Sequence, residues 1–379
     1  MADRLTEYRR KRDAARTPEP VPPERPRRRT GGRARFVIQQ HHARSLHWDL
    51  RLERDGVLAS WAVPRGLPRE PGRNHLAVHT EDHPMEYLDF AGEIPAGEYG
   101  GGRMTIHDRG TYHCEKWQDR EVVVQLHGDR TAGRYVLFAT GGRGDRDWMV
   151  RRTDPAPPGW TSMPELVAPM HSTRAARLPA DPSQWGFELR WDGIRAVAYV
   201  SGGRLRLLAE TGEEITGEYP WLRAMAEALA PTEAVLDGVL VRIDQAGRVR
   251  PPRAGRPDPG HPASGQPDHG GGDRAGRSGR GRPGHGGRGA TDTQYLLVDL
   301  LWLEGVTSTG LAYPQRRQLL DGLALAGPRW QTPPWFAGAG AETLAAAREQ
   351  GLPGVLAKRL DSGYEPGRRS PAWRSVDAS

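Results

Sequence analysis

Short segments of alternating apolar and polar residues fill the chain from Arg35 to about Asp154. Gly, Pro and Asp separate these segments, and Asp55-Gly56 stands between two of them as a tight hairpin turn. Alternation with a period of two is typical of β-strands, and short, closely spaced strands favour a closed or nearly closed β structure. The strands predicted from this pattern are residues 35–40, 46–54, 57–63, 76–79, 103–107, 121–126 and 135–138.

The pattern changes after a proline-rich stretch, residues 155–184, which we interpret as a linker. From Trp185 onward, apolar runs of strand length mix with longer segments of helical periodicity. We therefore predict an α+β protein of two domains, residues 35–154 and 185–379. In the second domain the predicted strands are 186–191, 196–200, 205–208 and 234–243, and the predicted helices are 219–229, 315–323 and 341–350.

One segment of the second domain, residues 251–290, has nothing to bury. It holds 13 Gly, 7 Pro and 7 Arg, and it contains no Val, Ile, Leu, Met, Phe, Trp or Tyr. Such a segment cannot offset its ordering entropy, so we predict a disordered insert. Its Arg-Gly character would also suit nucleic-acid binding, although an insert without function is the simpler interpretation. A local shift of reading frame would produce the same composition.

Charge and composition show where the positive charge lies and exclude two classes of protein. The net charge is +7, but residues 1–35 carry +7, the insert carries +4 and the other 304 residues sum to −4. We interpret residues 1–34 as a basic, partly disordered arm with a short helix over 5–16, suited to a phosphate backbone. No apolar run is long enough to span a membrane, and the single cysteine, Cys114, excludes a disulfide scaffold. We expect a cytoplasmic, nucleoid-associated protein.

The candidate chemistry lies on the predicted strand 46–54. Alternation places His47, Asp49 and Arg51 on one face and apolar side chains on the other, where they should form core. His47 and Asp49, with His41 from the preceding strand, could supply ligands to a divalent ion such as Mn²⁺. Arg51 could hold a phosphate by its guanidinium fork. The alternative is that these are hydrogen-bonded surface residues.

A further histidine, His83, alternates with His79 and Glu81 just before Pro84. It is a candidate phosphate contact or acid, and a turn residue is the alternative.

These segments together resemble the 3′-phosphoesterase domain of bacterial DNA ligase D, the multifunctional enzyme of non-homologous end joining. The resemblance covers the arm and the first domain. It implies a small β-barrel and a Mn²⁺-dependent activity that removes a 3′-terminal ribonucleoside and then the 3′-phosphate to leave a 3′-hydroxyl. The segments that carry it are residues 5–13, 17–20, 39–53, 60–66, 81–87 and 94–100.

The resemblance also assigns roles to individual positions. The family's metal ligands match His41, His47 and Asp49. Its phosphate contacts match Arg51 and His83, with Tyr87 close by. Further substrate-binding positions match Arg12, Asp13 and Glu19 in the arm, together with Arg65, where the family has lysine, and His75, where a basic residue is common.

The second domain resembles the adenylation domain of ATP-dependent DNA ligases, a nucleotidyltransferase fold. Its nucleotide-binding motif, Lys-x-Asp-Gly-x-Arg, is matched by Arg190, Asp192 and Arg195, and a later phosphate-contacting lysine by Lys358. The nucleophilic lysine is thus Arg190, and a guanidinium offers no lone pair for attack on ATP. Other positions of that mechanism have changed as well, namely Val239, Pro353, Val298 and residues 373–377. We interpret the domain as degenerate and ATP as unused.

The sequence therefore predicts a phosphoesterase that heals DNA 3′ ends, fused to a degenerate ligase-like domain. Its substrates would be primer-template ends, including ribonucleotide-terminated ones, and it would need no membrane. The Ku protein, a repair polymerase and a separate ligase are the partners that the family context implies. One alternative is a working ATP-dependent DNA ligase, which would form a covalent protein–AMP adduct. The other is a non-catalytic scaffold that binds DNA ends without turnover.

Overall fold

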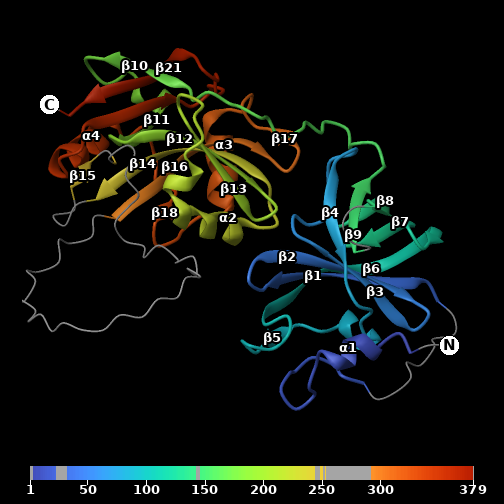
Figure 1. Ribbon diagram of the computed structural model, residues 1–379. Coiled ribbons are helices and arrows are strands. Elements are labelled where there is room, and N and C mark those ends of the chain that lie inside the picture. The colour runs from blue at the N-terminus through green and yellow to red at the C-terminus, as the bar shows by residue number, and fades with distance from the viewer. Residues whose placement is uncertain are drawn as a thin grey trace, which may run out of the picture.

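The structure is a computed structural model that describes residues 3–22, 32–141, 146–243, 248–250, 252 and 292–378. Apart from Pro252, the predicted disordered insert lies outside these residues. Two domains follow one another along the chain, as Figure 1 shows. None of the helices in the described ranges has the length and apolar character to cross a membrane.

The first domain is a β-barrel, as predicted. In the described part of the chain, eight strands form a ring in the order β1-β2-β3-β4-β9-β8-β7-β6, and β6 pairs with β1 to close it. The short strand β5 pairs with the first residues of β6, from Gly102 to Met104. The bounds are β1 (Ala34–His42), β2 (Leu46–Arg54), β3 (Val57–Val63), β4 (Asn74–His79), β5 (Gly92–Ile94), β6 (Gly102–Gln118), β7 (Glu121–Gly128), β8 (Ala132–Ala139) and β9 (Asp147–Arg152).

The barrel interior is filled by one face of each strand. Trp48, Leu50 and Leu52 of β2 are fully or almost fully buried there, which confirms that this face of the strand is core. The opposite face of β2, with His47, Asp49 and Arg51, therefore lies on the outside of the barrel wall. Burying the interior aromatic and aliphatic side chains supplies the main stabilisation of the domain.

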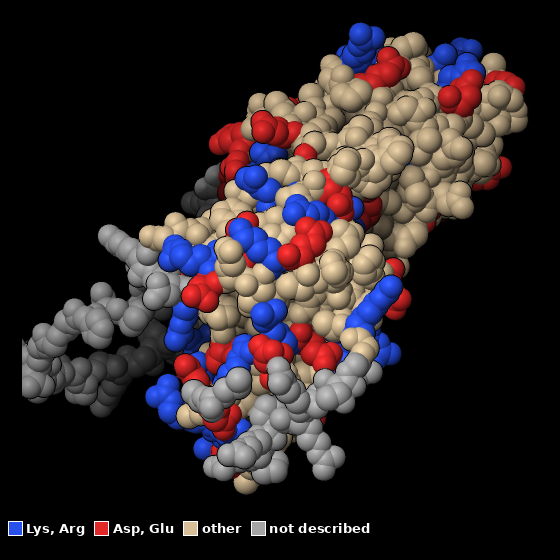
Figure 2. Space-filling view, turned by 90° about the vertical axis from the view of Figure 1, so that its right-hand side faces the viewer, with Lys and Arg blue, Asp and Glu red and all other residues tan. Residues whose placement is uncertain are grey.

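The N-terminal arm covers this outer face. Helix α1 (Thr6–Arg10) is shorter than predicted, and Leu5 and Tyr8 pack with Tyr87 of the 3₁₀ turn η1 (Met85–Leu88). Basic arm residues pair with barrel carboxylates, as in Arg4 with Asp82 at 2.7 Å. Basic and acidic side chains consequently alternate over the lower part of the face seen in Figure 2, where the arm and barrel lie. The arm's charge is thus partly neutralised by the barrel.

The second domain holds two sheets and three helices among the described residues, which confirms the α+β prediction. One sheet has the order β10-β21-β20-β11-β19 and the other β13-β12-β14-β16-β17, with β15 on β14 and β18 on β16. The strands are β10 (His171–Ala175), β11 (Trp185–Arg190), β12 (Ile194–Ser201), β13 (Arg204–Ala209), β14 (Ala234–Ile243), β15 (Val249–Arg250), β16 (Asp292–Leu303), β17 (Val306–Thr307), β18 (Trp330–Gln331), β19 (Phe336–Ala337), β20 (Gly354–Arg359) and β21 (Arg369–Asp377).

Helices α2 (Arg223–Leu229), α3 (Tyr313–Gly322) and α4 (Gly340–Glu349) complete the second domain, with the 3₁₀ turns η2 (Pro182–Gln184), η3 (Thr216–Glu218) and η4 (Pro220–Leu222). Strand β10 lies inside the segment predicted as a linker and pairs in parallel with β21. The second half of that segment therefore belongs to the second domain. Its polar sequence shows no alternation, so local pattern gave no sign of the strand.

The two domains touch at the turn between β12 and β13. Gly202 has a φ of +54°, and a Cβ there would lie 2.7 Å from the carbonyl oxygen of Arg65 in the barrel. A side chain at this position would meet both backbone strain and a steric clash. Arg69 of the barrel forms an ion pair with Glu304 of the turn between β16 and β17.

Acid should destabilise the barrel by protonating histidines that burial, full or partial, keeps uncharged. His79 packs against Trp61 and Trp148, with ring centroids 5.1 and 5.7 Å away, and burial lowers its pKa below the ordinary 6.5. The unfolded chain therefore binds more protons than the folded one as the pH falls below about 6.5, and stability present above that pH is lost. His79→Gln should lose less unfolding free energy between pH 7.5 and 5.5 than wild type, measured by hydrogen exchange of barrel peptides.

The matched control is His113→Gln, which makes the same replacement at an exposed histidine on β6. Equal pH dependence in His79→Gln and wild type would contradict the assignment.

Candidate active site

Three potential metal ligands meet on the outer face of the β1–β2 hairpin. His41 on β1 lies directly opposite His47 on β2, and Asp49 follows two residues later on the same face. One ligand atom from each of the three lies within 4.8 Å of the others. Alternation predicted the shared face of His47 and Asp49, with His41 as a possible third ligand from the preceding strand, and the antiparallel register brings His41 beside them.

Backbone carbonyls orient both imidazole rings. Nε2 of His41 lies 2.8 Å from the carbonyl oxygen of Gly100, and Nδ1 of His47 lies 3.0 Å from that of Ser45. These contacts assign the N–H of each ring to the carbonyl side. The other nitrogens, Nδ1 of His41 and Nε2 of His47, then face Asp49 at 3.7 and 3.8 Å. This is the arrangement that fixes histidine tautomers around a metal.

Arg51 lies beside the trio, and one of its guanidinium nitrogens makes no hydrogen bond in the described structure. Its Nε donates to Oε1 of Gln39 at 2.7 Å, and its Nη2 donates to Asp49 at 3.0 Å. Gln39 is in turn fixed by donating to the carbonyl oxygens of Tyr87 and Phe90 at 3.0 and 2.8 Å. The remaining Nη1 of Arg51 is buried and has no hydrogen-bond partner in the described structure. A buried guanidinium with an unused donor is suited to an anion such as phosphate.

The arm and η1 supply the opposite wall. Arg12 donates to Glu19 at 2.7 Å and to Glu81 at 3.0 Å, and it stacks 3.9 Å above the Tyr8 ring. The hydroxyl of Tyr87 donates to Glu19. This buried network ties the arm to the barrel and places the Arg12 guanidinium in the same cavity as the metal-ligand trio.

His83 completes this wall. Its Nδ1 lies 2.8 Å from the carbonyl oxygen of Glu81, and its Nε2 lies 3.4 Å from Nη2 of Arg12. Because arginine only donates, Nε2 is the acceptor and Nδ1 carries the proton. Burial, together with the charges of Arg51 and Arg12, holds the pKa of His83 well below 6.5. The ring is therefore uncharged at neutral pH.

The surroundings of Asp49 and Tyr87 set the protonation states of these two side chains in the cavity. Burial alone would raise the pKa of Asp49, but the guanidinium of Arg51 outweighs it and holds that pKa below its ordinary value. Asp49 is thus ionised and able to act as an oxygen ligand. Burial raises the pKa of Tyr87, so its hydroxyl stays protonated.

The cavity fits a divalent ion beside a phosphate. It measures about 230 Å³ and is lined by Arg12, His41, His47, Asp49, Arg51, His83 and Tyr87 among others. Two imidazole nitrogens and one carboxylate form a donor set that suits a first-row ion such as Mn²⁺. The unused donor of Arg51 beside that set is the observation that favours a phosphate-bearing substrate.

Three sequence-predicted residues lie outside this cavity. Asp13 is exposed and caps a turn of the arm by accepting from the backbone N–H of Ala15. Arg65 lines a different cavity, at the domain junction. His75 is buried, with Nδ1 2.7 Å from the carbonyl oxygen of Gly66.

Sequence reasoning assigned no role to two residues that the structure places at the site. Gln39 fixes Arg51, and its alternation with His41 on one strand was the available signal. Glu81 holds both Lys11 and Arg12, each at 3.0 Å, and its alternation with His83 was the corresponding signal.

The structure brings together only some positions of the ligase-like motif: Arg195 and Lys358 lie 5.8 and 4.2 Å from the centre of the same Trp373 ring. Arg190 on β11 pairs with Asp377 at 2.6 Å and donates to the carbonyl oxygen of Pro353 at 3.1 Å. Arg195 donates from Nε and Nη2 to the two carboxylate oxygens of the buried Asp237, and Asp192 is exposed. The β11–β20 register places Lys358 opposite Gly186, well away from Arg190.

Lys358 is completely enclosed. Its ammonium donates to Glu188 at 3.0 Å and to the carbonyl oxygen of Val298 at 3.1 Å, and it lies 4.2 Å above the Trp373 ring. Asp299 lies 3.7 Å away. Burial lowers the pKa of Lys358, and the two carboxylates oppose that effect.

Each of the two domains matches a known protein family. Residues 39–139 match the DNA Ligase D 3'-phosphoesterase domain, and residues 164–376, more than half of the chain, match the ATP dependent DNA ligase domain. The chain belongs to the DNA ligase D family.

The family assignment extends to individual relatives. The chain is 44% identical to the multifunctional non-homologous end joining protein LigD of Mycobacterium bovis, and the match covers 98% of this chain and 45% of that protein. It is 32% identical to the LigD protein of Pseudomonas aeruginosa, with 97% and 46% coverage. The chain thus spans about half the length of these relatives.

Among solved structures, the ligase domain of Mycobacterium tuberculosis LigD is 36% identical. That match covers 56% of this chain and 59% of that chain, with a TM-score of 0.43.

Proposed function

We propose that the first domain of this DNA ligase D family member is a metal-dependent phosphoesterase. It converts DNA 3′ ends that carry a ribonucleotide or a phosphate to 3′-hydroxyl ends during non-homologous end joining. The observation that carries the proposal is the His41, His47 and Asp49 trio next to the unused donor of Arg51, in one cavity.

In this proposal the residues of the cavity have three roles: metal binding, phosphate binding and proton acceptance. A divalent ion held by His41, His47 and Asp49 would supply Lewis-acid activation and charge neutralisation. Arg51 binds phosphate oxygens through Nη1, and Gln39 keeps its guanidinium in place. In this proposal, Nε2 of the uncharged His83 exchanges its 3.4 Å contact with Arg12 for a hydroxyl or water in the cavity and accepts a proton from it.

The second proposal concerns the ligase-like domain, which does not form an AMP adduct. Adenylation needs an amine nucleophile, and the motif position holds Arg190, whose guanidinium is paired with Asp377. Lys358 is engaged in its own buried network. Sealing of the healed end would then fall to a separate ligase, with the Ku protein and a repair polymerase as further partners in the cytoplasm.

The decisive experiment supplies the purified chain with primer-templates that end in a 3′-ribonucleotide or a 3′-phosphate. With Mn²⁺ the products should end in a 3′-hydroxyl, and with EDTA no product should form. Absence of any 3′-hydroxyl product with Mn²⁺ overturns the phosphoesterase proposal, and end binding without turnover would support a scaffold. Incubation with labelled ATP tests the second proposal, which a covalent protein–AMP adduct would refute.

A further inference from the structure

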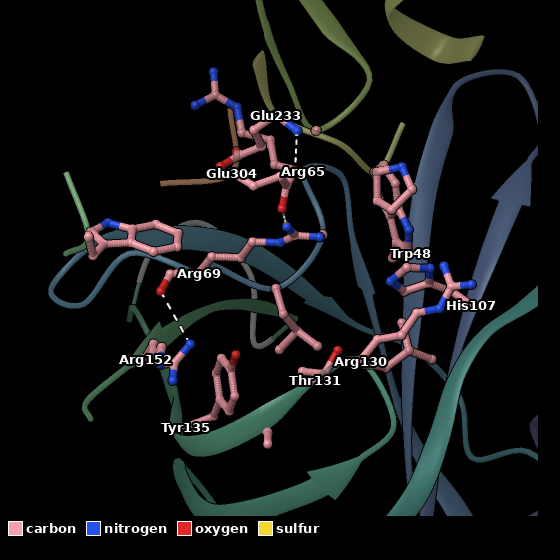
Figure 3. A pocket seen from close by; sticks show the side chains of 17 residues that line it. Trp48, Arg65, Arg69, His107, Arg130, Thr131, Tyr135, Arg152, Glu233 and Glu304 are labelled. Atoms are coloured by element: carbon pink, nitrogen blue, oxygen red, sulfur yellow. Dashed lines mark hydrogen bonds and ion pairs between the residues drawn. The ribbon is translucent and has the colours of Figure 1, made fainter. Parts of the chain in front are cut away.

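A second cavity lies between the barrel and the C-terminal domain. It measures about 320 Å³, which reaches the size range of small-molecule sites, from ~300 Å³ upward. The barrel, the segment after it and the C-terminal domain all contribute walls, and no lining residue is shared with the phosphoesterase cavity. Figure 3 shows Arg69, Arg152 and Tyr135 on one side, with Arg130 and His107 across from them.

The walls carry an excess of positive charge. Four arginines line the cavity, Arg65, Arg69, Arg130 and Arg152, against the two carboxylates of Glu233 and Glu304. Both carboxylates are engaged, because Glu304 pairs with Arg69 and accepts the backbone N–H of Glu233, while Glu233 accepts the hydroxyl of Ser201. Within the described ranges, Arg65 and Arg130 form no ion pair. Like charges gathered at a junction favour an anion between them.

Two residues that line this cavity also carry buried donors without partners. Nε of Arg152 and Nε1 of Trp160 are buried and make no hydrogen bond in the described structure. The hydroxyl of Tyr135 points into the same space (Figure 3). Unsatisfied buried donors are rare in folded proteins, and acceptor oxygens of a bound molecule would satisfy them.

We propose that this junction cavity binds a phosphate-bearing ligand of mononucleotide size. The guanidinium groups take the phosphate through their forked N–H donors. Glu233 and Glu304 retain free lone pairs, which accept hydrogen bonds from the hydroxyl or amino groups of a nucleoside. The ligand touches both domains and so fixes their relative position. The proposal is independent of the phosphoesterase function, because the two cavities are separate.

Calorimetric titration of the full chain with AMP, in EDTA, tests this directly. Arg130→Gln and, separately, Arg152→Gln should weaken AMP binding about tenfold, since each removes a charge-assisted contact. Arg223→Gln, an exposed arginine at the start of α2, is the matched control and should bind like wild type. Arg130 is exposed and has no ion pair among the described residues, so its replacement should leave the fold intact.

Three outcomes would overturn the proposal. Absence of binding would do so, as would binding that survives both Arg130→Gln and Arg152→Gln. Loss of AMP binding in Arg51→Gln instead would place the ligand in the phosphoesterase cavity. A parallel titration with pyrophosphate tests the nucleoside requirement, because pyrophosphate that binds as tightly as AMP would remove it.

Discussion

His47→Ala is expected to lower Mn²⁺-dependent processing of 3′ ends by about a hundredfold or more, because loss of a direct ligand should exceed the 10–100-fold cost of losing an outer-shell partner. The side chain is partly exposed and its one hydrogen bond is to the carbonyl oxygen of Ser45, so its removal should spare the fold. Metal affinity should fall in parallel. Primer-end assays over a range of Mn²⁺ concentrations, with a separate Mn²⁺ titration followed by electron paramagnetic resonance, measure both effects.

The exposed His127 on β7 offers a matched control, since His127→Ala should retain wild-type turnover and Mn²⁺ affinity. Wild-type activity in His47→Ala would show that the trio is not the metal site. Reduced activity with unchanged Mn²⁺ affinity would instead assign His47 to the substrate.

Lys358→Met should destabilise the C-terminal domain by about 3–5 kcal/mol, the usual cost of removing one partner from a buried ion pair. The variant leaves Glu188 and Asp299 buried without the ammonium that lies 3.0 and 3.7 Å from them. Arg316 still compensates Asp299, at 2.8 Å, which limits the loss. Urea unfolding followed by hydrogen exchange of C-terminal peptides reports the free energy of this domain separately from the barrel.

Lys116 provides the comparison within the same chain. It pairs with Glu121 on the barrel surface, where the two side chains are 40% and 36% exposed, so Lys116→Met should cost no more than about 1 kcal/mol. A similar small effect in Lys358→Met would mean that the buried network is not structural and that the lysine is free for other chemistry.

The pattern of apolar and polar residues predicted those strands that a short stretch of sequence is enough to define. The bounds of β2 and β3 agree with the prediction, because alternation and the Asp55-Gly56 turn mark them clearly. Those of β14 agree because its apolar run of strand length is almost continuous. Strand β9 was missed because its core residues Trp148 and Val150 are embedded among arginines and aspartates. Its position depends on pairing with β4 and β8, which no local window contains.

Local sequence likewise predicted one part of the candidate site and could not predict another. Alternation along β2 predicted the shared face of His47, Asp49 and Arg51, since strand geometry alone sets it. That this face lies outside the barrel and is closed by the arm could not be predicted, because contacts such as Arg12 with Glu81 join residues far apart in sequence. The enclosure of Lys358 likewise arises from the packing of several elements, not from its own segment.

The parallel pairing of β10 with β21 has a practical consequence for handling the C-terminal half in isolation. A fragment cut at Trp185, where the motif-bearing strands begin, would lose β10 and leave β21 as a bare edge open to self-association. It would also lose Met163, Val167 and Met170, which pack against the core of that half. A fragment begun near Pro157 keeps these contacts and should express as a soluble, monodisperse species.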